Sequence, residues 1–354
     1  MPLMHRYFAT FAPGFEGIVG NLLSRAIPEA VPVTVSSGMA LFDYAGDPSR
    51  TSDAVFFNNV FFVVQEWRTA GIPFPELVRT AAKNNRLAGL AGELRLPGIK
   101  TFRVRYSKEN QFCAVDKKTM DDAERHIARC TGFTADRLNP DMEFWFLTRR
   151  EGLSFFAARL TDKQSTEKYL KKGELRPEIV QLLVGLARVT PEDRVILDPF
   201  AGHGSIPARL AEVCPGSLLL VSDIDPALVD ALSGRFEGRE HIRVSCADAL
   251  ALLHVDPASV DLVVTDPPWG FWDADAYSGA NSLDTLYAGM LAEFARVLRA
   301  GGRAFVLTGA KREFEAAVAA CPEFAASADG FDGIPFRTDI LVNGKKSAVY
   351  SLRR

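Results

Sequence analysis

Strand-like and helix-like segments alternate along the second half of the chain, and this alternation restricts the fold more than any other feature. Short apolar runs occur at 195–198, 218–222, 242–246, 262–265 and 304–307. Longer amphipathic segments occur at 177–189, 206–213, 227–236 and 283–298. Strands that alternate with helices form a mostly parallel sheet with helices on both faces. We therefore expect an α/β domain over residues 177–354.

Two glycine-containing pairs indicate how this domain continues towards its C-terminal end. Gly301-Gly302 follows the segment 283–298 and predicts the end of that helix. Asn343-Gly344 lies between two strand-like runs, 338–342 and 348–352, and is a strong signal for a hairpin turn. The parallel sheet is therefore expected to finish with an antiparallel hairpin.

The first half of the chain has a different organisation, in which strands outnumber helices. Strand-like runs are at 7–11, 32–36, 40–44, 60–65, 100–106, 143–147 and 153–160, and helical segments are at 15–27, 75–84 and 117–131. The pattern predicts an α+β region. A polar, turn-rich stretch at 46–52 suggests a small N-terminal segment, 1–50, ahead of a second domain, 51–162. The polar residues 163–176, with Lys163, Lys168, Lys171 and Lys172, are interpreted as a linker.

The strand 100–106 carries an alternating pattern of aromatic and basic residues. Phe102, Val104 and Tyr106 alternate with Arg103 and Arg105, so one face should pack while the other is cationic. Lys108 extends the basic edge. On the strand alone, we favour an ordinary solvated sheet face over contact with RNA.

The charge balance of the two halves differs. Residues 1–176 hold 25 Lys and Arg against 20 Asp and Glu, a net charge of +5, and residues 177–354 hold 16 against 24, a net charge of −8. A basic half joined to an acidic half suggests that the first half contacts any nucleic acid. A solvated surface without a partner would explain the same modest asymmetry.

Length and cysteine spacing set further bounds. A chain of 354 residues is long enough for two domains with separate cores. The five cysteines form no Cys-x-x-Cys pair and have no histidine at metal-ligand spacing, so we expect reduced thiols and no metal site. The sequence shows neither a leader peptide nor a membrane span. A cytoplasmic protein without an obligate protein partner is expected.

The glycine-containing motif from Asp198 to Ser205, Asp-Pro-Phe-Ala-Gly-His-Gly-Ser, lies where the first strand of the α/β domain turns into a helix. Ligands of such sheets bind beyond the carboxyl ends of the strands. Gly202 and Gly204 would let a ligand approach the backbone closely. The third glycine of a dinucleotide fingerprint is missing, because Pro207 occupies its place.

Two further strands of this domain are also followed by carboxylates. Asp223 closes the second strand, 19 residues after Gly204, and is placed to bind ribose hydroxyls. Asp225 precedes Pro226 and is assigned as the cap of the next helix. Asp248 follows the third strand and would accept a hydrogen bond from an adenine amine.

Asp266-Pro-Pro-Trp269 follows the fourth strand and is an unusual turn. The two prolines fix the backbone and remove two amide donors. A carboxylate and a prolyl carbonyl are two acceptors for the N–H bonds of a planar amine, and the indole offers a stacking surface. A packed turn without a ligand is the alternative interpretation.

These four features, in this order, resemble class I methyltransferases that depend on S-adenosylmethionine and methylate exocyclic amines. The resemblance implies a Rossmann-like domain. It also implies a cofactor site formed by Asp198, Pro199, Phe200, Ala201, Gly202, Gly204, Ser205, Asp223, Ile224, Asp248, Ala249 and Asp266. The catalytic residues it implies are Asp266, Pro267, Pro268 and Trp269.

Segments of the first half resemble RNA methyltransferases that contain a THUMP domain. The segments are Tyr-Phe-Ala-Thr-Phe-Ala-Pro-Gly-Phe-Glu (7–16), Thr-Phe-Arg-Val-Arg-Tyr-Ser-Lys (101–108), Phe-Phe-Ala-Ala-Arg-Leu-Thr (155–161) and Leu-Arg-Pro (175–177). This resemblance implies a ferredoxin-like segment and a THUMP domain ahead of the catalytic domain. It implies tRNA as the partner, with N2-methylguanosine as the product, and Arg103, Arg105 and Lys108 as RNA contacts.

The sequence departs from the usual pattern of this family at two positions. His203 replaces a small residue, and Trp269 replaces the commoner tyrosine, so no role of a hydroxyl group transfers. We interpret His203 as structural or solvent-facing.

Three other functions remain as alternatives. The same chemistry could act on an rRNA guanine or on the N6 amine of adenine in DNA or RNA. A nicotinamide-dependent oxidoreductase is disfavoured by the missing third glycine. A non-catalytic RNA-binding protein is disfavoured by the intact acidic residues of the site.

Overall fold

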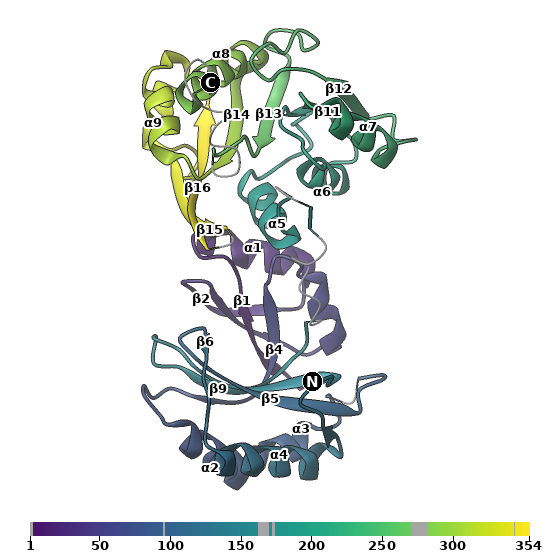
Figure 1. Cartoon of the computed structure of the whole chain (residues 1–354), viewed down its shortest axis with the longest axis vertical. Helices are drawn as coiled ribbons and strands as arrows, with labels where there is room; N and C mark the ends of the chain where they lie inside the picture. Colours follow the sequence, from purple (N-terminus) through teal and green to yellow (C-terminus); the bar gives the residue numbers. More distant parts are fainter. Residues whose placement is uncertain (1–2, 95, 162–169, 172–173, 271–281, 343) are drawn as a thin grey trace. The chain divides into compact units, whose positions relative to one another are not determined.

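The structure is a computed structural model, and it describes residues 3–94, 96–161, 170–171, 174–270, 282–342 and 344–354. The chain divides into two compact units (Figure 1). The first comprises Met1–Phe11 and Val19–Gln164, and the second comprises Ala12–Ile18 and Ser165–Arg354. Most of the predicted linker, including Lys163, Lys168 and Lys172, lies outside the described residues, as does Asn343.

Within the described residues of the second unit, seven strands form one sheet in the order β12-β11-β10-β13-β14-β16-β15. The strands are β10 (Val195–Asp198), β11 (Leu218–Asp223), β12 (Ile242–Cys246), β13 (Val260–Thr265), β14 (Leu298–Thr308), β15 (Arg337–Val342) and β16 (Lys345–Arg353). The pairs from β12 to β14 are parallel, whereas β16 pairs with β14 and β15 in antiparallel register. Both the parallel sheet and the antiparallel hairpin predicted from the sequence are confirmed.

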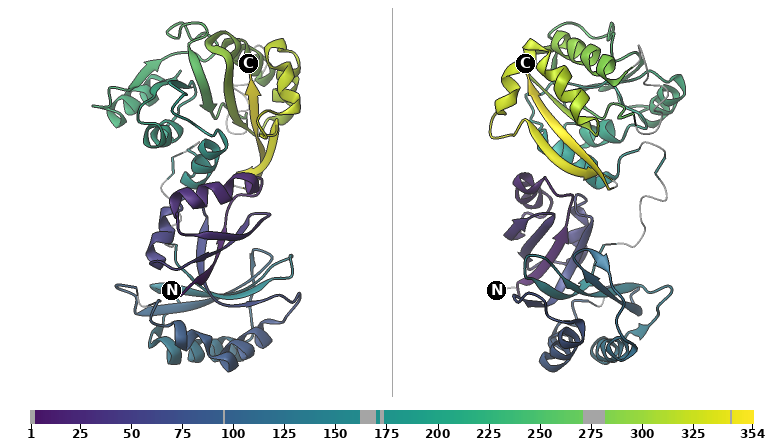
Figure 2. Two further views of the ribbon diagram at one scale, coloured as in Figure 1. Left: turned by 180° about the vertical axis from the view of Figure 1, so that it is seen from behind. Right: turned by 60° about the vertical axis from the view of Figure 1, so that its left-hand side comes forward.

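Helices cover both faces of this sheet (Figures 1 and 2). They are α5 (Pro177–Leu186), α6 (Ser205–Val213), α7 (Pro226–Arg235), α8 (Leu283–Val297), α9 (Lys311–Ala319) and the 3-10 helix η5 (Pro322–Asp329). The apolar sides of α8 and α9 pack on β13, β14 and β16. Phe294 of α8, Phe314 of α9 and Tyr350 of β16 are fully buried in this core. This burial supplies most of the driving force that holds the helices on the sheet.

The helix predicted at 283–298 is present, but the role predicted for Gly301-Gly302 as its end was wrong. Helix α8 ends at Val297, because Leu298 already has an extended conformation and begins β14. Gly301 and Gly302 lie inside that strand, where Gly301 has a φ of +76°. Residues 311–329, for which we predicted no element, contain α9 and η5.

The first unit is a mixed sheet with helices on one face. Its main strand order is β2-β3-β1-β4-β9-β8-β5-β6, with β7 beside β5. The strands are β1 (His5–Thr10), β2 (Val31–Ser36), β3 (Met39–Tyr44), β4 (Asn59–Trp67), β5 (Thr101–Lys108), β6 (Gln111–Phe112), β7 (Thr134–Ala135), β8 (Met142–Thr148) and β9 (Ser154–Arg159). This is the α+β organisation that the sequence predicts.

Helices α2 (Phe74–Asn84), α3 (Arg86–Leu90) and α4 (Lys117–Thr131) lie together below the strands β5 and β9 (Figure 1), and α2 also contacts β8. Helix α1 (Glu16–Ala26) and the 3-10 helix η1 (Pro48–Asp53) complete the elements. The strands before and after residue 50 belong to one sheet, since β1 pairs with both β3 and β4. The division at residue 50 and the THUMP assignment stay predictions.

Among the described residues, none of the helices combines the length and the apolar composition that crossing a membrane requires.

Candidate active site

The predicted site residues meet at the carboxyl edge of the parallel sheet. Asp198 is the last residue of β10, Asp223 is the last of β11, and Asp266 directly follows β13. Strand β10 lies between β11 and β13 in parallel register, so the three strand ends are neighbours. The structure therefore brings together acidic residues that are up to 68 positions apart in the sequence.

Asp198 is the most buried acid of the site, with 2% of its surface exposed. Its Oδ1 accepts hydrogen bonds from Thr265 Oγ1, at 2.7 Å, and from the Phe200 amide, at 3.3 Å. Its Oδ2 is also buried and has no hydrogen-bond partner among the described residues. Burial raises the pKa of Asp198 to about 7, because the charged form loses its hydration. An unpartnered buried acceptor of this kind is a site for a ligand's donor group.

The two glycines of the loop after β10 have different surroundings. The Gly202 amide donates to Asp223 Oδ2 at 2.8 Å, which ties this loop to the end of β11. A Cβ atom on Gly202 would meet nothing within 4 Å, whereas one on Gly204 would lie 2.7 Å from Leu232 Cδ2. Gly202 thus faces open space, and Gly204 allows close packing against α7.

The residues after β11 have separable roles. Asp225 accepts from the Ala227 amide at 2.8 Å and caps α7, as the sequence predicts. Asp223 Oδ1 accepts from the Asp225 amide at 3.0 Å, so both of its oxygens orient the local backbone. The side chain of Ile224 is 66% exposed, which is unusual for isoleucine and leaves an apolar surface beside Asp223.

After β12, Asp248 is exposed and Ala249 is buried. Asp248 Oδ1 accepts from the Leu250 amide at 2.9 Å, so it shapes the turn in the present structure.

The Asp-Pro-Pro-Trp turn is held by hydrogen bonds at two points. The Trp269 indole Nε1 donates to Asp266 Oδ1 at 2.8 Å, and the Tyr287 hydroxyl donates to the Pro268 carbonyl at 2.9 Å. Asp266 retains partial exposure, but burial around its carboxyl group raises the pKa to about 8. Repulsion from Asp198 acts in the same direction, and the bond from Trp269 opposes it.

These two bonds determine which acceptors of the turn are in use. Asp266 Oδ1 and the Pro268 carbonyl are engaged, and among the described residues no hydrogen bond reaches Asp266 Oδ2 or the Pro267 carbonyl. Two neighbouring acceptors and an indole ring form a suitable set for a flat group that carries an NH₂.

His203 lies in the loop between β10 and α6 and is partly exposed. Its carbonyl accepts from Arg235 at 2.5 Å, which links the loop to α7 through the backbone.

The predicted RNA contacts in the first unit are less cationic than the strand pattern suggests. Arg103 and Arg105 both pair with Glu143, at 2.5 and 3.5 Å, and Glu143 also accepts from Arg159 at 3.1 Å. The carboxylate is only 2% exposed, and hydrogen bonds from arginines keep its pKa low despite burial. Lys108 is exposed at the end of β5.

Aromatic side chains accompany these arginines. The Arg105 guanidinium lies 5.2 Å from the centre of the Phe112 ring, and Phe112 is 66% exposed. The Trp145 ring lies 5.2 Å from Phe112, and its indole donates to Glu143 at 3.0 Å. This face, defined by Arg103, Arg105, Phe112, Glu143 and Trp145, is hereafter called the arginine–aromatic face.

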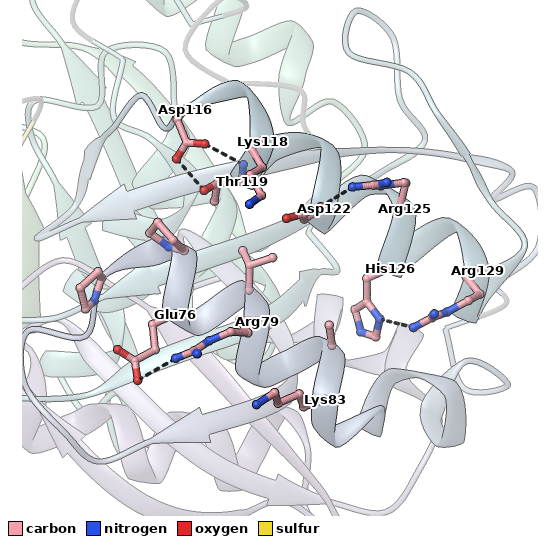
Figure 3. A pocket seen from close by; sticks show the side chains of 14 residues that line it. Glu76, Arg79, Lys83, Asp116, Lys118, Thr119, Asp122, Arg125, His126 and Arg129 are labelled. Atoms are coloured by element: carbon pink, nitrogen blue, oxygen red, sulfur yellow. Dashed lines mark hydrogen bonds and ion pairs between the residues drawn. The ribbon is translucent and has the colours of Figure 1, made fainter.

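A groove of about 1010 Å³ lies between α2 and α4 of the first unit (Figure 3). Two ion pairs line this groove, one between Glu76 and Arg79 and one between Asp122 and Arg125. His126, which also lines the groove, contacts Arg129. None of the residues predicted from the sequence lines this groove.

Comparison with known proteins finds a family match within the second unit. A family model described as an RMKL-like methyltransferase domain matches residues 219–327. These residues thus resemble a methyltransferase domain, and the second unit is hereafter called the methyltransferase domain after this match. The match covers the Asp-Pro-Pro-Trp turn, Asp223 and Asp248.

The proteins that are similar to the chain include two curated relatives. A probable ribosomal RNA small subunit methyltransferase A of Methanosarcina mazei is 36% identical over 87 residues, which are 25% of this chain and 30% of that protein. The mouse protein tRNA (guanine(6)-N(2))-methyltransferase THUMP3 is 26% identical over 73% of this chain and 52% of its own length. The chain thus spans about half or less of the curated relatives it matches.

The crystal structure of TrmN from Thermus thermophilus has the same fold. It superposes with a TM-score of 0.76 at 22% sequence identity, and covers 99% of this chain and 100% of its own. Together with the family match, this confirms the fold class and the resemblance drawn from the sequence.

The methyltransferase domain contains groups that fit S-adenosylmethionine. Asp198 Oδ2 is a buried acceptor without a partner among the described residues, Gly202 faces open space, and Ile224 exposes an apolar surface beside Asp223. In the described part of the chain, no cluster of three or more histidine, cysteine or acidic side chains could hold a metal ion.

Thr265 and Tyr287 contact predicted residues, Thr308 contacts Tyr287, and the sequence indicated none of these three side chains. Thr265 donates to Asp198, and Tyr287 and Thr308 form a hydroxyl pair at 2.8 Å beside Pro268. Tyr287 belongs to the apolar stripe of α8 and Thr308 to the end of a buried strand. Both positions fit the pattern of ordinary core residues. The sequence therefore contains no signal that distinguishes Tyr287 and Thr308 from other residues of the core.

Proposed function

We propose that this protein is an S-adenosylmethionine-dependent RNA methyltransferase that methylates the exocyclic N2 amine of a guanosine in tRNA. The observation that carries the proposal is the pair of acceptors in the Asp-Pro-Pro-Trp turn, Asp266 Oδ2 and the Pro267 carbonyl, which hydrogen bonds from Trp269 and Tyr287 leave available. The choice of guanosine in tRNA rests on the resemblance and on the name of the mouse relative.

Residues of the sheet edge would hold the cofactor. Asp223 would bind the ribose hydroxyls, Asp248 the adenine amine, and the exposed Ile224 would cover a face of the adenine ring. Asp198 Oδ2 would accept from the ammonium group of the methionine part. When bound, S-adenosylmethionine supplies a methyl group that its sulfonium charge already activates.

The turn itself would align and activate the amine. Asp266 Oδ2 and the Pro267 carbonyl would each accept one N–H bond, which positions the nitrogen and favours its tetrahedral form. The ionised form of Asp266, which predominates above its pKa of about 8, would stabilise the positive charge that develops on nitrogen. With a pKa of about 8, this carboxyl group is also suited to receive a proton from the product.

Trp269 would stack on the guanine. A base must leave its helix before it can reach such a site, and an aromatic surface compensates for the stacking it loses. The indole has two functions in this proposal, since its ring faces the base while its N–H orients Asp266.

The first unit would bind the RNA. The arginine–aromatic face and Lys108 provide positive charge beside the exposed ring of Phe112, which suits phosphate contacts and base stacking. Glu143 reduces the charge of this face by one unit, so we expect a moderate contribution to affinity.

A ribosomal RNA guanine is the second candidate target, because the archaeal relative is named as a ribosomal RNA methyltransferase. The four residues of the turn accept any exocyclic amine, including N6 of adenine. The target is therefore decided by experiment.

The test is to incubate unmodified tRNA, and separately rRNA, with the protein and labelled S-adenosylmethionine, and to identify the methylated nucleoside by mass spectrometry. We expect N2-methylguanosine in tRNA. Asp266→Ala should abolish transfer while the dissociation constant for S-adenosylmethionine changes little. Methylation of rRNA or of adenine would replace the proposed target, and full turnover by Asp266→Ala would refute the role of the turn.

A further inference from the structure

A continuous chain of hydrogen bonds runs through the core of the methyltransferase domain to the Asp-Pro-Pro-Trp turn. The Ala310 amide lies 3.1 Å from Thr308 Oγ1, which lies 2.8 Å from Tyr287 Oη, which lies 2.9 Å from the Pro268 carbonyl oxygen. Tyr287 and Thr308 have no exposed surface. Water therefore does not compete for these groups in the folded protein.

The chemistry of the groups fixes the direction of every bond in this chain. The Pro268 carbonyl can only accept, so the single hydroxyl hydrogen of Tyr287 must point to it. Tyr287 Oη must then accept from Thr308, which in turn accepts from the Ala310 amide. Bonds aligned in one direction polarise and strengthen one another.

The chain connects the turn to rigid parts of the fold. Thr308 is the last residue of β14, which pairs with β13 up to Thr265, the residue before Asp266. Tyr287 lies on α8, and its ring packs edge-on against Phe314 of α9 at 5.4 Å. The position of the Pro268 carbonyl is therefore determined by α8 and β14.

We propose that Tyr287 and Thr308 are positioning residues that hold the turn so that the Pro267 carbonyl and Asp266 Oδ2 point to the amine of the substrate. This inference rests on the proposed function of the turn. Engagement of the Pro268 carbonyl by Tyr287 removes it as a competing acceptor and leaves one prolyl carbonyl for one N–H bond. Without the hydroxyl, the peptide group after Pro268 can rotate and the two acceptors lose their alignment.

A purely structural role would give a different result from a positioning role. A buried tyrosine hydroxyl that only satisfies a carbonyl contributes to stability, and its loss lowers the melting temperature without a selective effect on turnover. A positioning hydroxyl acts on turnover, and leaves affinity for the RNA and for the cofactor unchanged.

Tyr350→Phe is a matched control within the same domain. Tyr350 is also fully buried, its hydroxyl bonds Glu315 at 2.7 Å, and its ring packs on the same Phe314 at 4.6 Å. It lies on β16 and makes no hydrogen bond to the turn. Both substitutions remove one buried hydroxyl group.

The experiment compares Tyr287→Phe, Thr308→Val, Thr308→Ser and Tyr350→Phe in the full chain. For Tyr287→Phe we expect kcat to fall about tenfold or more, with KM for the RNA and the cofactor dissociation constant within about twofold of wild type. Thr308→Val should lower kcat less than Tyr287→Phe does, and Thr308→Ser should retain wild-type turnover. The double variant with both Tyr287→Phe and Thr308→Val should have the same kcat as Tyr287→Phe alone. Tyr350→Phe should retain wild-type kcat.

Hydrogen exchange gives a readout that does not depend on activity. The amides of Trp269 and Gly270 should exchange faster in Tyr287→Phe than in Tyr350→Phe, and the Ala310 amide should exchange faster in Thr308→Val. Wild-type kcat and unchanged exchange at Trp269 in Tyr287→Phe would overturn the inference, as would an equal loss of kcat in Tyr350→Phe.

The outcome is separable from that of the proposed function. If the wild-type protein methylates a base other than guanine, the proposed target fails, and the same comparison of variants on that base still tests Tyr287 and Thr308. If the wild-type protein transfers no methyl group, the exchange of the Trp269 amide decides the inference alone.

Discussion

At the scale of single residues, Trp269 differs from the tyrosine that is commoner at its position, and the difference supplies a donor. Its Nε1 bonds Asp266 Oδ1 at 2.8 Å and opposes the rise in the pKa of that carboxyl group. Trp269→Phe keeps an aromatic ring and removes the donor. We expect kcat to fall about tenfold, since one charge-assisted hydrogen bond at the acceptor is lost. Steady-state kinetics on tRNA at saturating cofactor measure this change.

Trp145→Phe is the control for that substitution. Trp145 also donates its indole N–H to a carboxylate, Glu143, at 3.0 Å, but in the other unit of the chain. Its replacement should leave kcat at saturating RNA unchanged. Equal kcat values for Trp269→Phe and wild type would show that the indole N–H has no function in turnover.

Asp198 and Asp266 also determine how stability depends on pH. Burial raises their pKa values from 3.8 to about 7 and about 8, so the folded protein binds protons that the unfolded chain releases. Each group therefore contributes stability that is fully present below about pH 4 and is lost as the pH rises through the folded pKa.

The measurement compares wild type with Asp198→Asn in urea unfolding between pH 5.5 and 8. We expect the wild-type free energy of unfolding to fall relative to that of the variant, by an amount on the order of a few kcal/mol. Asn keeps the shape and an acceptor for Thr265 but does not titrate. Parallel curves for the two proteins would show that Asp198 is already ionised at pH 5.5.

At the residue scale, the sequence predicted the positions of site residues that lie at the ends of strands. Asp198, Asp223 and Asp266 follow strands that parallel pairing brings side by side, so their proximity follows from the alternating pattern. The bond from Trp269 to Asp266 and the contact from Tyr287 depend on side-chain directions that no periodicity encodes. For the same reason, the sequence did not show that Glu143 pairs with Arg103 and Arg105.

At the scale of secondary structure, the elements with a strong period were predicted well and those defined by turn geometry were not. The helix 117–131 and the strand 195–198 have the bounds that the sequence predicts. The glycine pair 301–302 was misplaced because β14 starts directly after α8, and a left-handed glycine within a strand has the same local signal as a helix end. Helix α9 begins at Lys311, shortly after β14 ends at Thr308, and the sequence analysis predicted no element there.

The loop after β10 gives an element-scale prediction, because its two glycines have opposite surroundings. Alanine at Gly202, with a φ of +53° and open space around it, should cost about 1 kcal/mol of stability from backbone strain. Alanine at Gly204 has similar strain and would also lie 2.7 Å from the buried Leu232, so about 2–4 kcal/mol should be lost. Urea unfolding measures both.

Cofactor affinity should rank the two variants in the reverse order. The methyl group of Gly202→Ala enters the space that the cofactor would occupy, whereas that of Gly204→Ala points to α7. We expect the dissociation constant for S-adenosylmethionine to rise more for Gly202→Ala, as measured by calorimetric titration. A larger rise for Gly204→Ala would mean that the cofactor does not approach this loop at Gly202.

At the scale of the whole molecule, the two units are expected to have different functions, methyl transfer in one and RNA binding in the other. The sheet edge of the methyltransferase domain holds the proposed acceptors, and the arginine–aromatic face belongs to the other unit. Deleting residues 1–160 would be a poor test of this division, because Ala12–Ile18 cluster with the second unit. Single substitutions in each unit avoid that difficulty.

Arg105→Ala and Asp266→Asn should therefore affect different kinetic constants. Loss of Arg105 would remove one proposed phosphate contact, so KM for tRNA should rise several-fold, kcat should stay constant, and the slope of log affinity against log salt should decrease by about 1. Asp266→Asn should lower kcat with little change in RNA affinity. The free-energy effects should add in the double variant, because the two sites share no hydrogen-bond partner.

Arg312→Ala controls for a general loss of positive charge, since Arg312 is 94% exposed on α9 in the other unit. Its replacement should leave both KM and the salt slope near wild type. If Arg105→Ala behaves like Arg312→Ala, the arginine–aromatic face is an ordinary solvated sheet surface, the interpretation that the strand pattern alone favours. If Arg105→Ala lowers kcat instead of raising KM, the face acts on the reaction and the division of work between the units is wrong.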